Sequence, residues 1–529
     1  MQLVECFVQE CEQFGVTELF GIPGDFVLPF FQALEQNGNL PLHYLSHEPA
    51  AVFAADGAAR ITNKPSVVIL TYGAGALNAV NAVAQAYVEH VPVVVVAGYP
   101  SAQEIERGLQ IHHQAKHVDS QRSIFKEITA TQVRIDQPET AAEKIREAFQ
   151  TAKERSRPVL IELPRNATEF QVKAVENYQP NPPNMQHLEH IVAPVITALQ
   201  KAKRPVILAG VDVRRFNATA ELEHLATRLN IPMLSTFMGR ASINQHHPMY
   251  CGIFLDKSDQ HATQLLSEAD CILQVGVIRT DSNFAANMAL FPDNKVFDLQ
   301  QHGPELSLRT QLRELGEALP SAFTAENMSI CRSRNSVETE VFCASRVAQV
   351  VEQIMSKRDH TFPVVSDVGD CLFASLNAYP TLLLAPAFYA SMGYAIPAAY
   401  GVMAATGMRP LIFVGDGAFL MTGLELGHFT RAGYAPIIVL FNNKKWDMIE
   451  AFSPGLGCTK LEHWNYVQLA EAMGGKGVSV SNEDELAQAF DNALMDTTRF
   501  TLIEAQLAPN SRTAKLQGFA DGFLAAGRC

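Results

Sequence analysis

The fold of this chain is indicated by two stretches, Leu411-Ile-Phe-Val-Gly-Asp-Gly417 and Pro436-Ile-Ile-Val-Leu-Phe-Asn-Asn443. Each is a short apolar run that ends abruptly in glycine or polar residues, which is typical of a strand buried on both faces of a parallel sheet. Open α/β sheets bind their ligands outside the carboxyl ends of the strands. The Gly-Asp-Gly and Asn-Asn motifs therefore stand where a ligand site is expected.

Four further runs of the same kind precede this pair, at residues 65–70, 92–97, 158–162 and 205–209, and helix-like stretches separate them. The polar segments 176–187 and 322–340, rich in Pro, Asn or Ser, are interpreted as linkers. The sequence thus predicts an α/β protein with three doubly wound parallel-sheet domains, which comprise residues 1–175, 188–325 and 341–529.

Composition excludes several classes of protein. The 529 residues are 47% hydrophobic and 18% charged, unlike a disordered or low-complexity chain. A net charge of -14 without a basic run argues against a nucleic-acid partner. The apolar runs are too short to span a membrane, and the nine cysteines form neither a CxxC pair nor the pattern of a disulfide framework. We expect a cytoplasmic enzyme.

Two familiar motifs are incomplete. The segment from Gly73 to Asn78 is similar to a dinucleotide-binding fingerprint, but Asn78 stands where the third glycine is required. His47 and Glu48 would begin a zinc-protease helix only with a histidine at position 51, which is Ala51. Neither a dinucleotide site nor a metalloprotease is predicted from these segments.

The Gly-Asp-Gly and Asn-Asn motifs are informative as a pair. Either alone is more often a simple turn after a strand. Separated by 24 residues, however, they place Asp416 and Asn443 at the ends of neighbouring strands, where their oxygen atoms can bind one hard cation. The flanking glycines allow a phosphate group to approach the main chain closely.

With this pair, the chain resembles the thiamine diphosphate (ThDP) enzymes, in particular the decarboxylases of 2-oxo acids, over essentially its whole length. The resemblance implies that Asp416, Asn443 and the main-chain carbonyl of Lys445 hold Mg²⁺, which bridges to the cofactor diphosphate. It also implies that the cofactor site contains further residues of the third domain, namely Gly369, Asp370, Gly415, Gly417 and Ala418, with main-chain N–H groups near the last two meeting the phosphates.

The N-terminal domain carries three more landmarks of this resemblance, Gly21-Ile-Pro-Gly-Asp25, His47-Glu48-Pro-Ala-Ala51 and Thr71-Tyr-Gly-Ala-Gly75. Thr71 belongs to the implied cofactor site. Glu48 would hydrogen-bond a pyrimidine nitrogen of ThDP, so that the protonated ring favours the imino tautomer whose nitrogen generates the ylide. Taken alone, Glu48 would be an ordinary solvated residue of a first helical turn.

The segment Ala390-Ser-Met-Gly-Tyr-Ala-Ile-Pro397 also matches the family. The resemblance implies that the carbonyl of Ala390 accepts the exocyclic amine of the cofactor. The bulky side chain of Met392 would wedge under the cofactor and force its two rings into a V. The alternative for Met392 is an ordinary core methionine.

In the family that this chain resembles, an adjacent pair of histidines distinguishes the decarboxylases from the synthases, oxidases and lyases that share the scaffold. This chain has such a pair in His112 and His113. After CO2 leaves, the enamine must be protonated, and two imidazoles beside Asp25 can supply that proton. An adjacent pair of histidines also arises by chance, as His246 and His247 illustrate before a proline.

The chain departs from the pyruvate decarboxylases after the metal motif. Those enzymes carry a catalytic glutamate six residues after the second Asn, where this chain has Ile449. Glu450 is the next residue, and if this segment is a helix, its side chain is rotated by roughly 100° from that of residue 449. The strings Trp446-Asp-Met-Ile-Glu450 and Trp464-Asn-Tyr466 look like the phenylpyruvate and indolepyruvate decarboxylase branch. There Asp281 matches an acidic residue that would take over part of the proton transfer.

Substrate size is predicted from residues near this departure. Pyruvate enzymes place a large aromatic residue two positions after Gly369-Asp370, whereas this chain has Leu372, which would leave room for a larger substrate. The predicted pocket comprises Leu372, Met448, Ile449 and Phe452, and the alternative is that Leu372, Met448 and Phe452 are core residues. We expect decarboxylation of an aromatic 2-oxo acid, such as phenylpyruvate or indolepyruvate, to the aldehyde and CO2.

Other functions remain open at this point. They are a ThDP-dependent carboligase or synthase, an FAD-linked 2-oxo acid oxidase and a non-catalytic ThDP-binding protein. The first has no need of the His112–His113 pair, the second lacks a convincing flavin motif in residues 185–340, and the third has no need of Glu48. The resemblance further implies a homodimer at minimum and a homotetramer as the assembled form, with no nucleic acid or membrane as partner.

Overall fold

The computed structural model describes residues 1–174, 185–257, 259–285, 288–302, 306–320, 341–358, 362–376 and 382–527. They form two compact units. The first contains the described residues of Met1–Gln179 with Tyr389–Pro410 and Thr422–Tyr434. The second contains those of Pro180–Phe388 with Leu411–Met421 and Ala435–Cys529.

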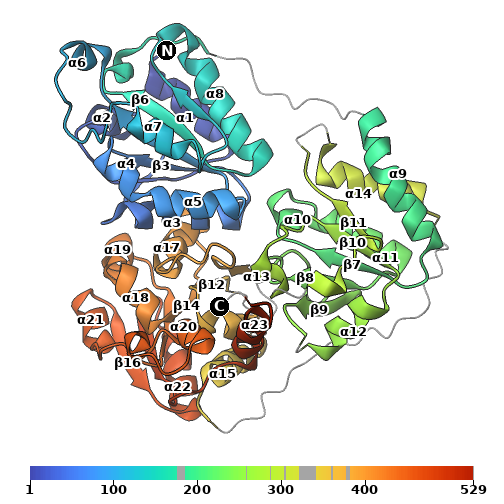
Figure 1. Cartoon of the computed structure of the whole chain (residues 1–529). Helices are drawn as coiled ribbons and strands as arrows, with labels where there is room; N and C mark the ends of the chain where they lie inside the picture. The colour runs from blue at the N-terminus through green and yellow to red at the C-terminus, as the bar shows by residue number, and fades with distance from the viewer. Residues whose placement is uncertain are drawn as a thin grey trace. The chain divides into compact units, whose positions relative to one another are not determined.

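The first unit is built on a six-stranded parallel sheet with the order β2-β1-β3-β4-β6-β5. The strands β3 and β6 of this sheet are labelled in Figure 1. Its strands are β1 (Leu19–Gly21), β2 (Leu42–Tyr44), β3 (Ser66–Leu70), β4 (Val93–Tyr99), β5 (Gln132–Arg134) and β6 (Val159–Pro164). Its helices are α1 (Leu3–Phe14), α2 (Leu28–Asn37), α3 (Glu48–Thr62), α4 (Ala74–Asn78), α5 (Val80–Val88), α6 (Ala102–Glu106), α7 (Ser120–Phe125), α8 (Pro138–Arg155), α17 (Ala395–Thr406) and α19 (Leu426–Ala432), with the 3-10 turns η1 (Ala167–Glu169) and η4 (Gly423–Glu425).

Both faces of this sheet are buried, which explains the continuous apolar runs in the sequence. In β3, Val67 and Ile69 pack in the core formed with α1 and α8. Val68 and Leu70 point to the opposite face because side chains alternate along a strand, and they are buried as well. A strand covered on two sides cannot show polar alternation, so it appears in the sequence as an unbroken Val/Ile run.

The helices α3 and α17, although distant in sequence, pack closely within the first unit. A Cβ atom on Gly401 would lie 1.8 Å from the carbonyl oxygen of Ala54, and one on Gly57 would lie 2.2 Å from the carbonyl oxygen of Ala398. Two glycines, one on each helix, therefore allow the two backbones to approach to a distance that any side chain would prevent. This contact fixes α3, whose first residue is Glu48, against the segment that follows Ala390 and Met392.

The second unit contains two more parallel sheets, with the orders β11-β10-β7-β8-β9 and β13-β12-β14-β15-β17-β16. Elements of the first are α9 (Met185–Lys201), β7 (Pro205–Ala209), α10 (Asp212–Arg215), α11 (Thr219–Leu229), β8 (Met233–Thr236), β9 (Tyr250–Phe254), α12 (Gln260–Glu268), β10 (Cys271–Val275), α13 (Asp281–Phe284), η2 (Met288–Leu290), β11 (Val296–Leu299) and α14 (Leu308–Ala318). Elements of the second are α15 (Ala344–Ser356), β12 (Val364–Ser366), α16 (Asp370–Ser375), β13 (Leu383–Leu384), β14 (Leu411–Gly415), α18 (Asp416–Thr422), β15 (Ile437–Asn442), α20 (Asp447–Phe452), η5 (Gly457–Thr459), α21 (Tyr466–Ala472), β16 (Lys476–Val480), α22 (Glu483–Met495), β17 (Thr501–Gln506) and α23 (Ala514–Ala525).

The three predicted parallel sheets are confirmed, and the six predicted strands are β3, β4, β6, β7, β14 and β15. The first linker differs from the prediction, because α9 already begins at Met185. Leu188, Val192, Val195 and Leu199 give this helix a buried stripe with helical spacing, and the helix extends one turn before it. Residues 176–184 of that linker and the whole second linker, 322–340, lie outside the described residues.

The contact between α3 and α17 leads to a stability prediction. Gly401→Ala should destabilise the protein by about 1 to 3 kcal/mol or more and lower the thermal midpoint, because the methyl group forces the two helices apart. Gly427→Ala on α19 is the matched control, since a Cβ atom there meets nothing within 4 Å, and it should leave stability unchanged or slightly raised. Equal thermal midpoints for the two variants would contradict the proposed role of the close packing.

Candidate active site

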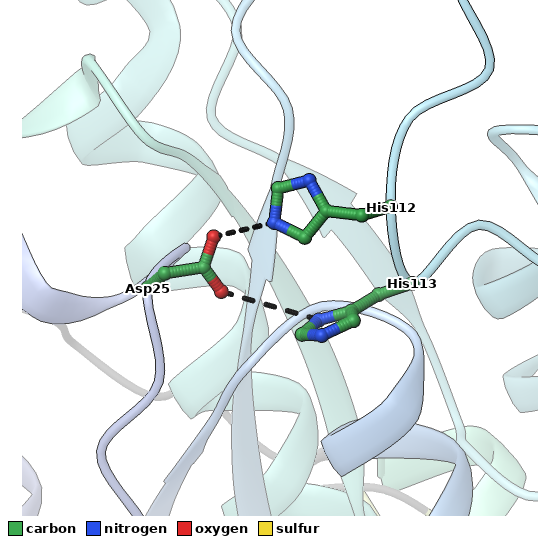
Figure 2. Close-up of side chains that lie close together, drawn as sticks. All are labelled: Asp25, His112 and His113. Carbon is green, nitrogen blue, oxygen red and sulfur yellow. Dashed lines mark hydrogen bonds and ion pairs between the residues drawn. The ribbon is translucent and has the colours of Figure 1, made fainter.

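Three predicted acid–base residues, Asp25, His112 and His113, come together in the first unit (Figure 2). Asp25 follows β1 after a short loop, and the histidines lie between α6 and α7. His112 Nε2 is 2.7 Å from Asp25 Oδ2, and His113 Nδ1 is 4.0 Å from Asp25 Oδ1. One carboxylate thus contacts two imidazoles, and such a group can hold and deliver a proton near neutral pH.

The charge state of Asp25 is set by its surroundings. Burial by itself would raise the pKa of Asp25, but the hydrogen bond from His112 and the positive charges of His112, Arg165 and His113 together lower it below its ordinary value. Asp25 is therefore a carboxylate at neutral pH and accepts the hydrogen bond from His112. As a consequence, Nδ1 of His112 is the ring nitrogen left for other partners.

A glycine positions the histidine loop. A Cβ atom on Gly73 would lie 1.9 Å from the carbonyl oxygen of His113, so a larger residue would push the loop away. Gly73 has a φ of +58°, and its N–H donates to Gln121 Oε1 at 2.8 Å. Gly73 and Gln121 are not among the residues predicted from sequence. The only sequence signal for Gly73 is its place in the Thr71 to Gly75 motif.

Glu48, the first residue of α3, has a partner that sequence reasoning missed. Asn78 Nδ2 donates to Glu48 Oε2 at 2.6 Å. Asn78 is the residue that interrupts the dinucleotide fingerprint. The same side chain contacts Glu48, the carboxylate that is expected to bind thiamine diphosphate. Nearby, a Cβ atom on Gly75 would be 3.4 Å from Glu48 Oε1 and 2.9 Å from Thr71 Cγ2, which places Thr71 in the same pocket of side chains.

The main chain around Ala390 is held in an unusual conformation. Ala390 has a φ of +62°, a region that residues with a Cβ atom rarely adopt. The N–H of Tyr389 donates to Glu89 Oε1 at 3.0 Å, and the N–H of Ser391 donates to Gln85 Oε1 at 3.2 Å. Two buried side chains of the N-terminal domain thereby hold the main chain here, and the N–H of Ser391 shares its peptide group with the Ala390 carbonyl that is predicted to bind the cofactor amine.

Glu89 belongs to a buried ionic network that supports this segment. Arg60 pairs with Asp56 and with Glu89, at 2.5 Å and 2.8 Å, and the hydroxyl of Tyr394 donates to Asp56 at 2.8 Å. Met392, in contrast, is 39% exposed although it is apolar, and so it is free to contact a ligand. A core methionine, the alternative weighed for this residue, would be buried.

The predicted metal residues occupy the ends of β14 and β15 in the second unit, which pair in parallel with Gly415 beside Phe441. Asp416 accepts hydrogen bonds from the N–H groups of Gly417 (2.9 Å) and Lys444 (2.7 Å), and Asn443 Oδ1 accepts one from the N–H of Lys445 (3.0 Å). The two oxygen-bearing side chains are thus fixed by the same turn.

The electrostatics of Asp416 favour a cation at this turn. Asp416 is 2% exposed, and burial raises its pKa to about 6 despite the hydrogen bonds from Lys444 and Gly417. No Lys, Arg or His side chain among the described residues forms an ion pair with it. A buried carboxylate without a cationic partner, next to an amide oxygen and main-chain carbonyls, is a donor set that suits a hard divalent cation.

Gly369 and Asp370 lie at the start of α16. Asp370 is buried and accepts hydrogen bonds from the main-chain N–H and the hydroxyl of Thr513, the residue that caps α23. Burial raises the pKa of Asp370 to about 7, although the bonds from Thr513 oppose this shift. These contacts tie Asp370 to the fold, and its predicted contact with the cofactor stays a prediction.

The predicted substrate residues divide into two groups. Leu372 is buried in a core cluster against which Met448 and Phe452 pack, so three of the four lie together. Ile449 is 53% exposed on α20. The core alternative weighed for the first three agrees with this packing, and their contact with a substrate stays a prediction.

Two further acidic residues, Glu450 and Asp281, differ in their burial. Glu450 is buried and accepts hydrogen bonds from the Thr459 hydroxyl (2.5 Å) and the Gly455 N–H (2.9 Å), which lower its pKa. Both carboxylate oxygens of Glu450 therefore already accept hydrogen bonds from the protein. Asp281 is the first residue of α13 and is exposed.

The residues present fit the cofactor that the sequence predicts. The hydroxyl oxygens of Thr71 and Ser391 are buried and have no hydrogen-bond partner among the described residues. Because an unsatisfied buried hydroxyl costs about 1 to 3 kcal/mol, such atoms in this chain are expected to meet a ligand or water. They lie beside Glu48 in one case and between Ala390 and Met392 in the other, where the pyrimidine part of the cofactor is expected.

Comparison with known proteins agrees with this geometry. Three family models described as "Thiamine pyrophosphate enzyme" match the chain. The model of the N-terminal TPP binding domain matches residues 1–123, that of the central domain matches residues 192–312, and that of the C-terminal TPP binding domain matches residues 367–505. No helix among the residues that the structure describes is long and apolar enough to cross a membrane.

Relatives align over nearly the full chain. Indole-3-pyruvate decarboxylase of Azospirillum brasilense is 37% identical, with 99% of this chain and 98% of that protein covered. Pyruvate decarboxylase isozyme 1 of Saccharomyces cerevisiae is 25% identical, and pyruvate decarboxylase of Kluyveromyces lactis is 26% identical, each covering 94% of both chains. With three parallel sheets and three matching domains, the chain belongs to the family of thiamine diphosphate-dependent 2-oxo acid decarboxylases.

Proposed function

We propose that this enzyme decarboxylates an aromatic 2-oxo acid, such as phenylpyruvate or indolepyruvate, to the aldehyde and CO2. The observation that carries the proposal is the 2.7 Å contact between His112 and Asp25, because it provides a proton donor. The choice of an aromatic substrate is supported by Ile449, an apolar residue where pyruvate enzymes carry a glutamate, and by the 37% identity to an indole-3-pyruvate decarboxylase.

The cofactor-binding roles are proposed as follows. Thiamine diphosphate, when bound, would supply the nucleophilic carbon and the electron sink that decarboxylation of a 2-oxo acid requires. Glu48, oriented by Asn78, would share a proton with the pyrimidine ring of the cofactor. The carbonyl oxygen of Ala390 would accept a hydrogen bond from the cofactor's exocyclic amine. Asp416, Asn443 and the carbonyl of Lys445 hold Mg²⁺ and thereby the diphosphate, next to the N–H groups of Gly417 and Ala418.

The acid–base roles follow from the charge states. His112, held by the Asp25 carboxylate, is assigned the role of proton donor, and His113, which belongs to the same group of side chains, is assigned the exchange of a proton with it through water. Asp281, exposed at the start of α13, is proposed as an additional proton relay. Protonation at carbon, followed by release of the aldehyde, completes the reaction.

The assembly and domain limits are also proposals. We propose a homodimer as the smallest active unit and a homotetramer as the assembled enzyme, in the cytoplasm, as the family resemblance implies. The domain limits 1–175, 188–325 and 341–529 each enclose one of the three sheets.

The metal assignment is tested by Asp416→Ala. The variant should lose Mg²⁺ and ThDP together, by at least about 100-fold in affinity, because even residues that only orient metal ligands typically cost 10- to 100-fold. Titration calorimetry of the cofactor-free protein measures both affinities. Asp484→Ala, an exposed acid on α22, is the control and should bind as the wild type does. Unchanged affinity in Asp416→Ala would remove this residue from the metal site.

Glu48→Gln tests the pyrimidine contact. The variant should retain cofactor but exchange the thiazolium proton for deuterium at least about 100-fold more slowly, because an amide cannot share a proton with the ring nitrogen. Nuclear magnetic resonance after acid quench measures the exchange. Glu143→Gln, exposed on α8, serves as the control. Wild-type exchange in Glu48→Gln would contradict the assignment.

Substrate size is tested with a panel of 2-oxo acids. Phenylpyruvate or indolepyruvate should exceed pyruvate in kcat/KM by about ten-fold or more, since burying a ring contributes about 1 to 3 kcal/mol. Ile449→Trp should shrink this ratio, whereas Met495→Trp, 77% exposed at the end of α22, should not. Leu372→Trp is a poorer test because Leu372 is buried and a larger ring would overpack the core. A preference for pyruvate would refute the aromatic proposal.

A further inference from the structure

Arg165 contacts the acid–base cluster but has no place in the roles above. It follows β6 directly, and its Nη2 lies 2.8 Å from Asp25 Oδ2. That oxygen is the same atom that accepts the hydrogen bond from His112 Nε2 at 2.7 Å. A guanidinium and an imidazole therefore share one carboxylate oxygen.

The surroundings hold Arg165 in this position. Its guanidinium carbon lies 4.3 Å from the ring centroid of Phe26, a distance suited to a cation–π contact. The same ring contacts His112, with centroids 4.8 Å apart. On its other side, Arg165 Nε is 3.6 Å from Glu104 Oε1, while Glu104 Oε2 is held by Ser101 at the start of α6.

The shared oxygen has an electrostatic consequence. A carboxylate paired only with His112 would hold the imidazolium tightly and make it a reluctant proton donor. With Arg165 on the same oxygen, part of the negative charge is already neutralised, and the guanidinium also repels a proton on either imidazole. Arg165 thus helps to keep Asp25 charged and shares the charge of its carboxylate with His112.

We propose that Arg165 is a positioning residue that sets the protonation state of the cluster of Asp25, His112 and His113 by sharing Asp25 Oδ2 with His112. The charged groups that face the cluster are Arg165 and, beyond it, Glu104, whose own charge is balanced in part by Arg107. This inference rests on the proposed function only for its effect on catalysis. Its effect on the histidines can be measured without any substrate.

The first test is the reaction of the histidines with diethyl pyrocarbonate, which modifies only the neutral imidazole. His112 is 60% exposed in the chain, so the reagent can reach it in cofactor-free protein. Trypsin releases both histidines in the peptide of residues 108–116, and mass spectrometry separates the two sites. In Arg165→Gln the midpoint of the pH dependence for His112 should move to higher pH, because the repulsion by the guanidinium is lost.

Three variants make this test specific. Arg165→Lys retains the charge and should restore a midpoint close to that of the wild type. Arg155→Gln removes an exposed arginine of α8 and should change nothing. Glu104→Gln should move the midpoint to lower pH, and this shift should vanish in the Arg165→Gln background if it acts through Arg165. Because Glu104 is on the periphery, its variant keeps the test decisive even if Arg165→Gln fails to fold.

The second test is kcat against pH with the preferred 2-oxo acid. Arg165→Gln should lower kcat at neutral pH by about ten-fold or more and move the whole bell-shaped profile to higher pH, with a smaller change in KM. A purely structural residue would lower the thermal midpoint and the active fraction without moving the profile. Superimposable pH profiles for wild type and Arg165→Gln, in both assays, would overturn the proposal. If the wild type decarboxylates no 2-oxo acid, the proposed function fails, while the histidine measurement still decides the role of Arg165.

Discussion

Parallel strand pairing is the constraint on which the candidate site depends. All strand pairs within the three sheets of the described chain are parallel, so the carboxyl ends of neighbouring strands meet at one edge of each sheet. In the first unit this edge bears Asp25 after β1, Thr71 after β3 and Arg165 after β6. In the second it bears Asp416 after β14 and Asn443 after β15. Residues scattered over the sequence thereby become neighbours without any local sequence signal.

The buried polar groups of the first unit include some that have partners within the protein and some that have none among the described residues. The buried ions Arg60, Asp56 and Glu89 compensate one another, and removing one of them would leave a buried charge without a partner. Their network fixes the main chain beside Ala390. In contrast, the buried Thr71 hydroxyl lacks a hydrogen-bond partner among the described residues. Because buried polar groups are normally hydrogen-bonded, this hydroxyl is expected to meet a ligand or water.

The sequence predicted the parts of this protein that depend on local pattern. The strands could be predicted, and the Gly-Asp-Gly, Asn-Asn and His-His motifs could be placed relative to them, because apolar runs and fixed spacings are local properties. The contacts of Gly73 with His113 and of Arg165 with Asp25 could not, because they join loops 40 and 140 residues apart through the strand order. Side-chain packing between distant segments could not be predicted either. The sequence alone therefore could not assign Leu372 to a pocket or to a core.

Asp25, His112 and His113 bring acid–base side chains together in the first unit, whereas α20 presents none at position 449. Ile449 cannot donate a proton, and Glu450 is occupied by the Thr459 hydroxyl and a main-chain N–H, with a lowered pKa. Ile449 and Glu450 are adjacent on this helix, so their side chains leave it in directions about 100° apart. The apolar side chain of Ile449 is 53% exposed on this helix, which agrees with the proposed aromatic substrate. Under the proposed function, the acid that protonates the product would come from the cluster of His112 and Asp25, where one carboxylate oxygen is shared by an arginine and a histidine.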